Sequence, residues 1–327
     1  MISRKEFLKQ SAAWGAAAVA GLSGGLPGKL ASAFAATGKS RVVIIRNPAV
    51  VKDGQVNQAV VSQMLRQAML RLTGAKIEAE AWRKFIKPTD VVGIKVNCLF
   101  GTNCSTRPEV TNAIVAGLGT AGVPERNVII WDRSTRDLIK SGFTPNADGP
   151  GVKVLADDDD WEAQPTKLAS FNGRLSKILT QKITALINAP ILKDHSGAGL
   201  TCAMKNHYGS FNNPGEHHGN HCDPYIADLN SLPAIKNKTR LIVCDAIMPI
   251  PQGGPGGGGR TRWPYGGLLV STDPVALDTQ GLMILNARRQ EIGTPILTAE
   301  QVPQLASAAA RGLGTNDPAK MEVIEIA

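Results

Sequence analysis

The sequence predicts an α/β fold, a single large domain with a mostly parallel β-sheet covered by helices on both faces. Two observations carry this prediction. Along residues 36–327, short apolar runs typical of buried strands alternate with stretches of helical periodicity. In addition, no linker or internal repeat divides this part of the chain, which at about 290 residues is long enough to bury one substantial core.

The first half of the chain alternates predicted strands with predicted helices. Continuous apolar runs rich in Val and Ile predict buried strands at residues 41–46, 91–96, 127–132 and 152–156. Apolar side chains recur at helical spacing in residues 56–72 and 109–118, each between two of these strands. Strands joined through a helix run parallel, so these elements predict the parallel part of the sheet.

The second half repeats the pattern. Further apolar runs predict strands at residues 186–191, 241–245, 268–271 and 321–326. Helical spacing predicts helices at residues 198–209, 275–288 and 300–311. Asp273 directly precedes Pro274, which is typical of a helix start, because Asp accepts hydrogen bonds from the first free N–H groups and proline is tolerated at the first helical position.

Residues 1–35 are predicted to be an export signal and not part of the fold. Residues 3–9, Ser-Arg-Lys-Glu-Phe-Leu-Lys, resemble the twin-arginine export motif, with Lys5 in place of the second arginine. The apolar run at residues 12–22 is too short for a stable membrane span, which needs about 20 apolar residues. Ala33-Phe34-Ala35 offers a cleavage site. We therefore expect an exported, periplasmic protein that meets the twin-arginine machinery, with the route for unfolded chains as the alternative.

The composition narrows the class of partner. The chain has 36 Lys and Arg against 27 Asp and Glu, a net charge of +9, and only 5% aromatic residues. No basic run with interleaved aromatics is present, so nucleic-acid binding is not expected. A mild excess of positive charge favours a small anionic molecule as the ligand.

Five cysteines leave the thiol chemistry open. Cys98 and Cys104 are close enough in sequence to close a small disulfide loop, although two free thiols fit equally well. The chain has no C-x-x-C motif, which argues against an iron–sulfur cluster held by cysteines.

Polar residues stand where several predicted strands end. Lys95 and Asn97 end one strand, two residues apart and hence on one face. Lys193 and His195 have the same spacing after residues 186–191. Ligands of open parallel sheets bind beyond the carboxyl ends of the strands, and a buried lysine there is costly unless it is paired or meets an anion. These residues predict a pocket for a phosphate or carboxylate.

A structural interpretation competes with that pocket. Asp132 and Asp245 also end predicted strands, so Lys95–Asp132 and Lys193–Asp245 could be ion pairs that serve only the fold.

All five histidines lie between His195 and His221. Imidazole and thiolate bind transition metals, and imidazole moves protons near neutral pH. Residues 196–199, Ser-Gly-Ala-Gly, lie at the start of the predicted helix 198–209 and could hold an anion on free N–H groups. On that helix Lys205 and Asn206 would share one face with Cys202, while His207 would be turned by about 100°.

The segment around His217 is the most metal-like. His217, His218, His221 and Cys222 could bind a transition metal, although a polar, mobile loop is the competing interpretation.

Residues 253–260 are rich in glycine and precede Arg262 and Trp263. Glycine runs are costly to order, so this segment could be a lid that brings Arg262 to an anion. A surface hairpin with Trp263 packed on the core is the alternative.

Several of these motifs resemble the family called domain of unknown function 362 (DUF362). The resemblance lies in Gly93-Ile-Lys-Val-Asn97 with Thr106-Arg-Pro108, Asn188-Ala-Pro-Ile-Leu-Lys-Asp-His195, Thr201 with Met204-Lys-Asn-His-Tyr-Gly209, and Ser271-Thr-Asp-Pro-Val-Ala-Leu-Asp278. It spans about residues 42–283 and implies a site at Lys95, Asn97, Lys193, His195, Lys205, Asn206, Asp273 and Asp278. Some members of that family carry a ferredoxin-like module and are described as iron–sulfur proteins. This sequence lacks the module, so a cluster is not implied here.

Two functions follow as hypotheses. The first is an exported enzyme acting on a small anionic substrate or cofactor, with an unknown reaction that a metal or redox cofactor could assist. Lys95, Lys193 and Lys205 would hold the anion, Asn97 and Asn206 would orient it, and His195, His207 and Asp278 would complete the site. The second is a periplasmic accessory protein that binds a metal or cofactor through His217, His218, His221 and Cys222 without turnover.

Overall fold

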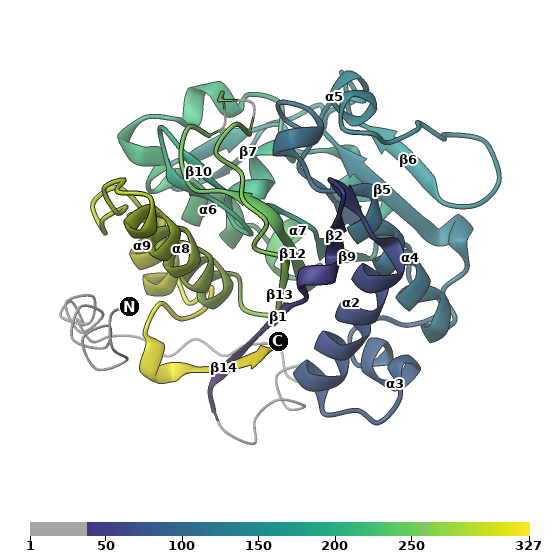
Figure 1. Cartoon of the computed structure of the whole chain (residues 1–327). Coiled ribbons are helices and arrows are strands. Elements are labelled where there is room, and N and C mark those ends of the chain that lie inside the picture. The colour runs from purple at the N-terminus through teal and green to yellow at the C-terminus, as the bar shows by residue number, and fades with distance from the viewer. Residues whose placement is uncertain (1–37, 255, 258) are drawn as a thin grey trace.

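The computed structural model describes residues 38–254, 256–257 and 259–327. The predicted leader, residues 1–35, lies outside them. A large mixed sheet forms the centre of the molecule (Figure 1), and its main strand order is β14-β1-β13-β12-β9-β4-β5-β6, with β10 beside β12 and β11 beside β10. The bounds are β1 Ser40–Arg46, β4 Val92–Lys95, β5 Val128–Asp132, β6 Lys153–Ala156, β9 Ala185–Asn188, β10 Ile191–His195, β11 Gly199–Thr201, β12 Thr239–Ile250, β13 Gly267–Ser271 and β14 Met321–Ile326.

Most neighbouring strands of this sheet run parallel. The parallel pairs are β1–β14, β4–β5, β4–β9, β5–β6, β9–β12 and β10–β12. Strand β13 is antiparallel to both of its neighbours, and β11 folds back on β10 as a hairpin. The predicted fold class, a mostly parallel sheet with helices, is therefore confirmed. Two small hairpins complete the strands: β2 Val51–Lys52 with β3 Gln55–Val56, and β7 Thr166–Leu168 with β8 Phe171–Gly173.

Helices cover both faces of the sheet, as the alternation within β1 requires. Val42 and Ile44 belong to one apolar core, whereas Val43 and Ile45 belong to a second core on the opposite face. The second core is covered by α2 Gln58–Thr73, α3 Glu78–Arg83 and α4 Pro108–Ala121. The first is covered by α6 Tyr225–Ser231, α7 Pro233–Lys236, α8 Pro274–Glu291 and α9 Gln304–Ala310. Helix α5 Thr135–Lys140 follows β5.

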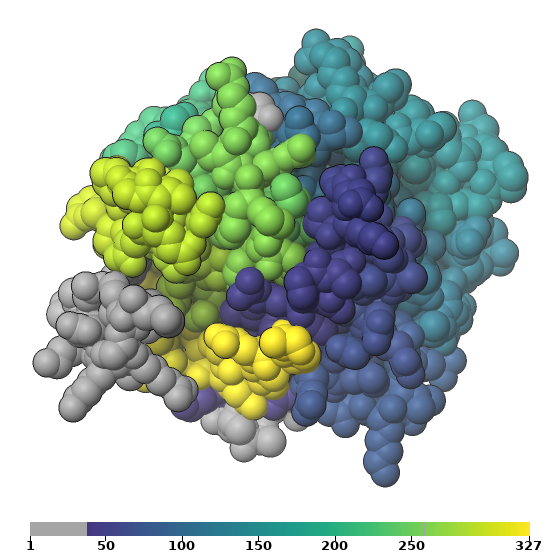
Figure 2. Space-filling model, viewed as in Figure 1, coloured from purple at the N-terminus to yellow at the C-terminus, as the bar shows by residue number. Residues whose placement is uncertain are grey.

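The two ends of the described chain meet at one side of the sheet. Strand β14 pairs with β1 over six residue pairs, from Ser40 opposite Met321 to Ile45 opposite Ile326. Figure 2 shows the N-terminal and C-terminal segments, purple and yellow, next to each other on this face.

Most predicted elements are confirmed, with shifted bounds. The predicted start of α8 is confirmed in detail: Asp273 Oδ1 accepts hydrogen bonds from the N–H groups of Val275 (2.9 Å) and Ala276 (2.8 Å). The predicted strand 186–191 is divided between β9 and β10, because Pro190 cannot donate to a ladder. Across the described ranges, no helix is both long and apolar enough to cross a membrane.

The predicted helix 198–209 is wrong. Residues Gly199–Thr201 form strand β11, and only Lys205–Gly209 are helical, as a short 3₁₀ turn. Gly199 has φ +70°, a left-handed conformation that suits glycine and interrupts a helix. Lys193 pairs with Thr201 and His195 with Gly199 across the hairpin. The Ser-Gly-Ala-Gly turn therefore joins two strands and is not a helix start that could bind an anion.

The contact between α3 and α4 provides a test of this packing. A Cβ at Gly117 would overlap the buried Trp82 indole, whereas a Cβ at the exposed Gly119 would meet nothing within 4 Å. Gly117→Ala should lower the free energy of unfolding by about 1–3 kcal/mol through overpacking. Gly119→Ala, on the same helix, should be neutral or stabilise by up to about 1 kcal/mol. Urea unfolding of both variants measures the difference, and equal effects would contradict the packing.

Candidate functional site

A cavity of about 110 Å³ lies at the carboxyl ends of β4, β5 and β10. It is the place where ligands of open parallel sheets bind. Seven residues predicted from the sequence line it, namely Lys95, Asn97, Lys193, His195, Lys205, Asn206 and His218. Among the other lining residues, Leu99, Thr201 and Tyr208 were not among the predicted site residues.

A buried ion pair forms the floor of the cavity. Lys95 Nζ lies 2.6 Å from Asp132 Oδ1 and donates a second hydrogen bond to the carbonyl of Val96 at 2.7 Å. Asp132 Oδ2 accepts the N–H of Cys98 at 2.7 Å and so fixes the turn that follows β4. A Cβ on Gly209 would overlap both members of the pair, which explains a glycine there. The ion-pair interpretation is correct for Lys95.

Lys193 has no carboxylate partner in the part of the chain that the structure describes. Its side chain is only 2% exposed, and its Nζ donates to Asn97 Oδ1 (3.0 Å) and to the carbonyl of Cys104 (2.7 Å), with the carbonyl of Leu99 at 3.5 Å. Burial lowers the pKa of Lys193 to about 8.

The predicted Lys193–Asp245 pair is wrong. Asp245 instead accepts hydrogen bonds from the guanidinium (2.8 Å) and the N–H (3.0 Å) of Arg107. Lys193 is therefore a buried cation surrounded by neutral acceptors.

Three asparagines hold the loops around this cation in place. Asn97 Nδ2 donates to Asn206 Oδ1 at 3.2 Å. Asn206 Nδ2 donates to the carbonyl of Lys95 (3.1 Å) and to Asn188 Oδ1 (2.7 Å). Asn188 then donates to the carbonyl of Ala203 at 2.7 Å. Asn97 and Asn206, predicted to orient a ligand, thus also position the cavity walls.

Lys205 lies against an aromatic ring and an imidazole. Its Nζ is 3.8 Å from the Tyr208 ring centroid and 3.4 Å from His218 Nε2. His218 Nδ1 lies 2.7 Å from the carbonyl of Pro214, which can only accept a hydrogen bond. The His218 proton therefore sits on Nδ1, and its Nε2 accepts from Lys205. Burial lowers the pKa of Lys205 to about 8.

His195 has the opposite tautomer. Its Nδ1 accepts the N–H groups of Gly197 (2.9 Å) and Ala198 (3.1 Å), so the proton sits on Nε2. Burial, reinforced by the nearby charge of Lys205, lowers the pKa of His195 to about 3. Its ring stacks on His218 with centroids 5.6 Å apart. His195 is thus a neutral hydrogen-bond donor at the cavity.

Thr201 contributes a polar atom without a partner. Its side chain is 3% exposed, it lines the cavity, and its Oγ1 has no hydrogen-bond partner among the described residues. Buried hydroxyl groups are normally hydrogen-bonded, so this one is suited to a ligand.

Asp278 and His207 were predicted to act in the site, but they lie behind it. Asp278 accepts the N–H groups of Ala203 (2.6 Å) and Met204 (3.1 Å), and burial raises its pKa to about 7. His207 is held by Ser210 and Asn188, and burial lowers its pKa to about 3. Asp278 fixes the backbone turn that leads into Lys205, because it anchors Ala203 and Met204. His207 lies within the 3₁₀ turn that contains Lys205.

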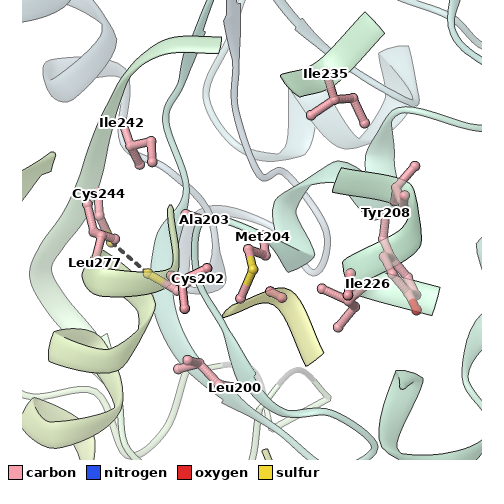
Figure 3. Close-up of a cluster of buried hydrophobic side chains, with 14 of the residues drawn as sticks. Leu200, Cys202, Ala203, Met204, Tyr208, Ile226, Ile235, Ile242, Cys244 and Leu277 are labelled. Atoms are coloured by element: carbon pink, nitrogen blue, oxygen red, sulfur yellow. Dashed lines mark hydrogen bonds between the residues drawn. The ribbon is translucent and has the colours of Figure 1, made fainter. Parts of the chain in front are cut away.

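Figure 3 shows that turn from the core side. Ala203 and Met204 lie among apolar side chains, and the thiols of Cys202 and Cys244 face each other with 3.5 Å between their sulfur atoms. All five cysteines are free, so Cys98 and Cys104 are two thiols and not a disulfide.

The four predicted metal ligands do not converge. His217 packs among aromatic rings and has both ring nitrogens near backbone groups, the carbonyl of Asn213 (3.2 Å) and the N–H of Asn172 (3.4 Å). His221 Nδ1 lies 3.0 Å from the carbonyl of Gly197. Cys222 is buried, and only His218 reaches the cavity. In the part of the chain described, no group of three or more His, Cys, Asp or Glu could hold a metal ion.

Arg262, predicted to bind the ligand, lies outside the cavity wall. Its guanidinium donates to the side chain of Asn103, and Trp263 packs partly buried against the core. Asp194, between the two cavity residues of β10, accepts the N–H groups of Gly253 (3.0 Å) and Gly254 (2.5 Å) and anchors the start of the glycine-rich segment. Closure of this segment over the cavity stays a prediction.

A family model described as "Domain of unknown function (DUF362)" matches residues 92–283. The chain belongs to the DUF362 family. The matched range contains Lys95, Lys193 and Lys205, and thus the whole set of cavity lysines. No curated protein matches the sequence.

A solved structure is similar in part. It is a structural-genomics crystal structure of a protein from Thermotoga maritima, with a TM-score of 0.45 and 8% identity over 72% of this chain and 60% of that one. The chain thus spans less than two thirds of that protein.

The two tautomers at the cavity can be tested directly. Nitrogen-15 NMR of the ring nitrogens should show His195 protonated on Nε2 and His218 on Nδ1. Because the pKa of His195 is lowered to about 3, its ring should stay neutral on acidification to well below the ordinary histidine range. His195 charging near its ordinary pKa of about 6.5 would contradict the buried geometry.

Proposed function

We propose that the protein is an enzyme that binds a small anionic ligand, bearing a phosphate or carboxylate group, in the cavity at the carboxyl ends of β4, β5 and β10. The observation that carries the proposal is the excess of buried positive charge. Lys193 and Lys205 are 2% and 6% exposed, and neither has a carboxylate partner in the described ion pairs. A buried ammonium without a counter-charge is costly, and an anion would remove that cost.

The polar groups around the two lysines also suit an anion. Thr201 offers a hydroxyl to which no described residue hydrogen-bonds, and His195 carries its proton on Nε2. Both can donate to an oxyanion. Asp132 is already paired with Lys95, so its charge is compensated before a ligand arrives.

The lowered pKa of the two lysines supports catalysis in addition to binding. Groups that titrate near neutral pH can exchange a proton during a reaction, and such groups gather at active sites. His195, in contrast, is held neutral and suits the stabilisation of developing negative charge.

Thr201→Val tests the anion site at a position that the fold does not need. Valine keeps the shape and removes a hydroxyl that has no hydrogen-bond partner among the described residues, so stability should be unchanged or slightly higher. Binding should weaken by about tenfold or more, because a hydrogen bond to a charged group contributes about 1.5–3 kcal/mol. Calorimetric titration with inorganic phosphate and, separately, with malonate measures binding of the two anion classes.

A second test compares Lys193→Met with a control variant, Lys238→Met, at a lysine whose contacts resemble those of Lys193. Lys238 also donates to three carbonyl groups, those of Leu179, Thr180 and Ile183, but it precedes β12 at the opposite end of the sheet. Lys193→Met should abolish anion binding, whereas Lys238→Met, with the same loss of charge, should leave the affinity unchanged. Equal affinities in all variants would contradict the proposed site.

We also propose that residues 1–35 direct export by the twin-arginine route. The support is the sequence of residues 3–9 and the cleavage site after Ala35. A fluorescent protein that becomes active only when it folds before export, fused to these residues, should appear active in the periplasm. Arg4→Gln with Lys5→Gln should retain it in the cytoplasm, since the exporter reads a pair of arginines and Arg4 with Lys5 stands at that place. A fusion protein that reaches the periplasm but stays inactive would point to the route for unfolded chains.

A further inference from the structure

The three lysines of the cavity differ in the hydrogen-bond partners of their amino groups. Lys95 faces a carboxylate and a carbonyl, which suit an ammonium ion. Lys193 has three oxygen acceptors, those of Asn97, Leu99 and Cys104, which match the three N–H bonds of an ammonium ion. The carboxylate of Asp132 keeps Lys95 charged. The oxygen acceptors around Lys193 likewise suit its charged form, and its long contact of 3.5 Å with the carbonyl of Leu99 is the one that an anion could replace.

Lys205 is different because its surroundings match a neutral amine. A neutral amine has two N–H bonds and one lone pair. His218 Nε2, which has no proton, can accept one N–H, and the Tyr208 ring face can accept the other. The lone pair then remains free, and Lys205 lines the cavity.

We propose that Lys205 is the nucleophile of this cavity and forms an imine with an anionic ligand that carries an aldehyde or ketone. The inference deepens the proposed function and rests on it, since the anion site would bring the carbonyl to Lys205. Lys193 and Thr201 would contact the anionic group, and the amine would face the carbonyl carbon.

The chemistry is balanced without any further reactant. The lone pair of Lys205 Nζ attacks the carbonyl carbon, and the C=O π electrons move to oxygen. His195 Nε2–H, in the same cavity wall, can donate a hydrogen bond to that oxygen. The carbinolamine then loses its oxygen as water, whose two hydrogens are one from Lys205 Nζ and one proton from solvent, and the nitrogen lone pair forms the C=N bond of a protonated imine.

The acidity of Lys205 agrees with this role. Burial lowers its pKa to about 8, and the charge of Lys193 acts in the same direction. At pH 7 about a tenth of Lys205 would be neutral, against roughly one in a few thousand for an ordinary lysine. Desolvation and a neighbouring cation are the means by which proteins activate lysine nucleophiles.

Pyridoxal 5′-phosphate tests the proposal because it joins an aldehyde to a phosphate. The full-length protein is incubated with it, reduced with borohydride and mapped by mass spectrometry. Pyridoxal, the same aldehyde without phosphate, is the matched probe. We expect Lys205 to be labelled in preference to Lys193, and by at least about tenfold more with the phosphate-bearing aldehyde, the factor that one charged hydrogen bond provides.

Two controls complete the design. Lys205→Arg keeps the positive charge but cannot form an imine, so labelling in the cavity should disappear. In the unmodified protein, excess inorganic phosphate should reduce labelling of Lys205 by competition, which requires no variant to fold.

The outcomes separate the inference from the function on which it rests. If Lys205 stays unlabelled while phosphate binding remains sensitive to Thr201→Val, the imine is overturned and the anion site stands. If both aldehydes label Lys205 equally and phosphate does not compete, Lys205 is a nucleophile but the anionic substrate class is overturned. Labelling spread evenly over Lys193, Lys205 and surface lysines would overturn the special role of Lys205.

Discussion

The buried ion pair between Lys95 and Asp132 is the interaction on which the candidate site depends. Two parallel strands, β4 and β5, end side by side and bring the two side chains to 2.6 Å. The second carboxylate oxygen then holds the N–H of Cys98, and this turn presents the side chain of Asn97 and the carbonyls of Leu99 and Cys104 to Lys193. Loss of either member of the pair would leave an uncompensated buried charge, which typically costs about 3–5 kcal/mol. The ion pair thus organises the environment of the second lysine.

A second set of contacts positions Lys205. Asp278 on α8 holds the backbone of Ala203 and Met204, and Asn188 holds the carbonyl of Ala203. The chain then turns so that Lys205 meets Tyr208 and His218. Three lysines within one cavity would repel each other if all were charged and unpaired. The partners of the three lysines reduce this repulsion in different ways. Lys95 is paired with a carboxylate, and Lys193 donates to neutral oxygens. Lys205 has partners that also suit a neutral amine, which carries no charge.

The sequence predicts the fold and much of the cavity for a clear physical reason. Apolar runs indicate strands, and apolar side chains at helical spacing indicate helices. Polar residues at the ends of parallel strands meet because these strands end at one edge of the sheet. This rule predicted four residues that line the cavity, Lys95, Asn97, Lys193 and His195. The hairpin at residues 195–201 was missed because its residues also fit a helix, and only pairing with β10 decides between them. Asp278 was placed in the pocket because sequence spacing does not show which distant backbone a carboxylate will hold. The histidines cluster in sequence, but separate backbone groups hold His217, His218 and His221 apart.

The central claim is that this cavity binds an anion between Lys193, Lys205 and Thr201. Arsenate is a direct probe, because it has the shape and charge of phosphate and its arsenic scatters X-rays anomalously. Crystals soaked in arsenate should give an anomalous peak inside the cavity, with arsenate oxygens in hydrogen-bonding contact with Thr201 Oγ1 and a lysine ammonium. An empty cavity in crystals that bind arsenate elsewhere at saturating concentration would contradict the account.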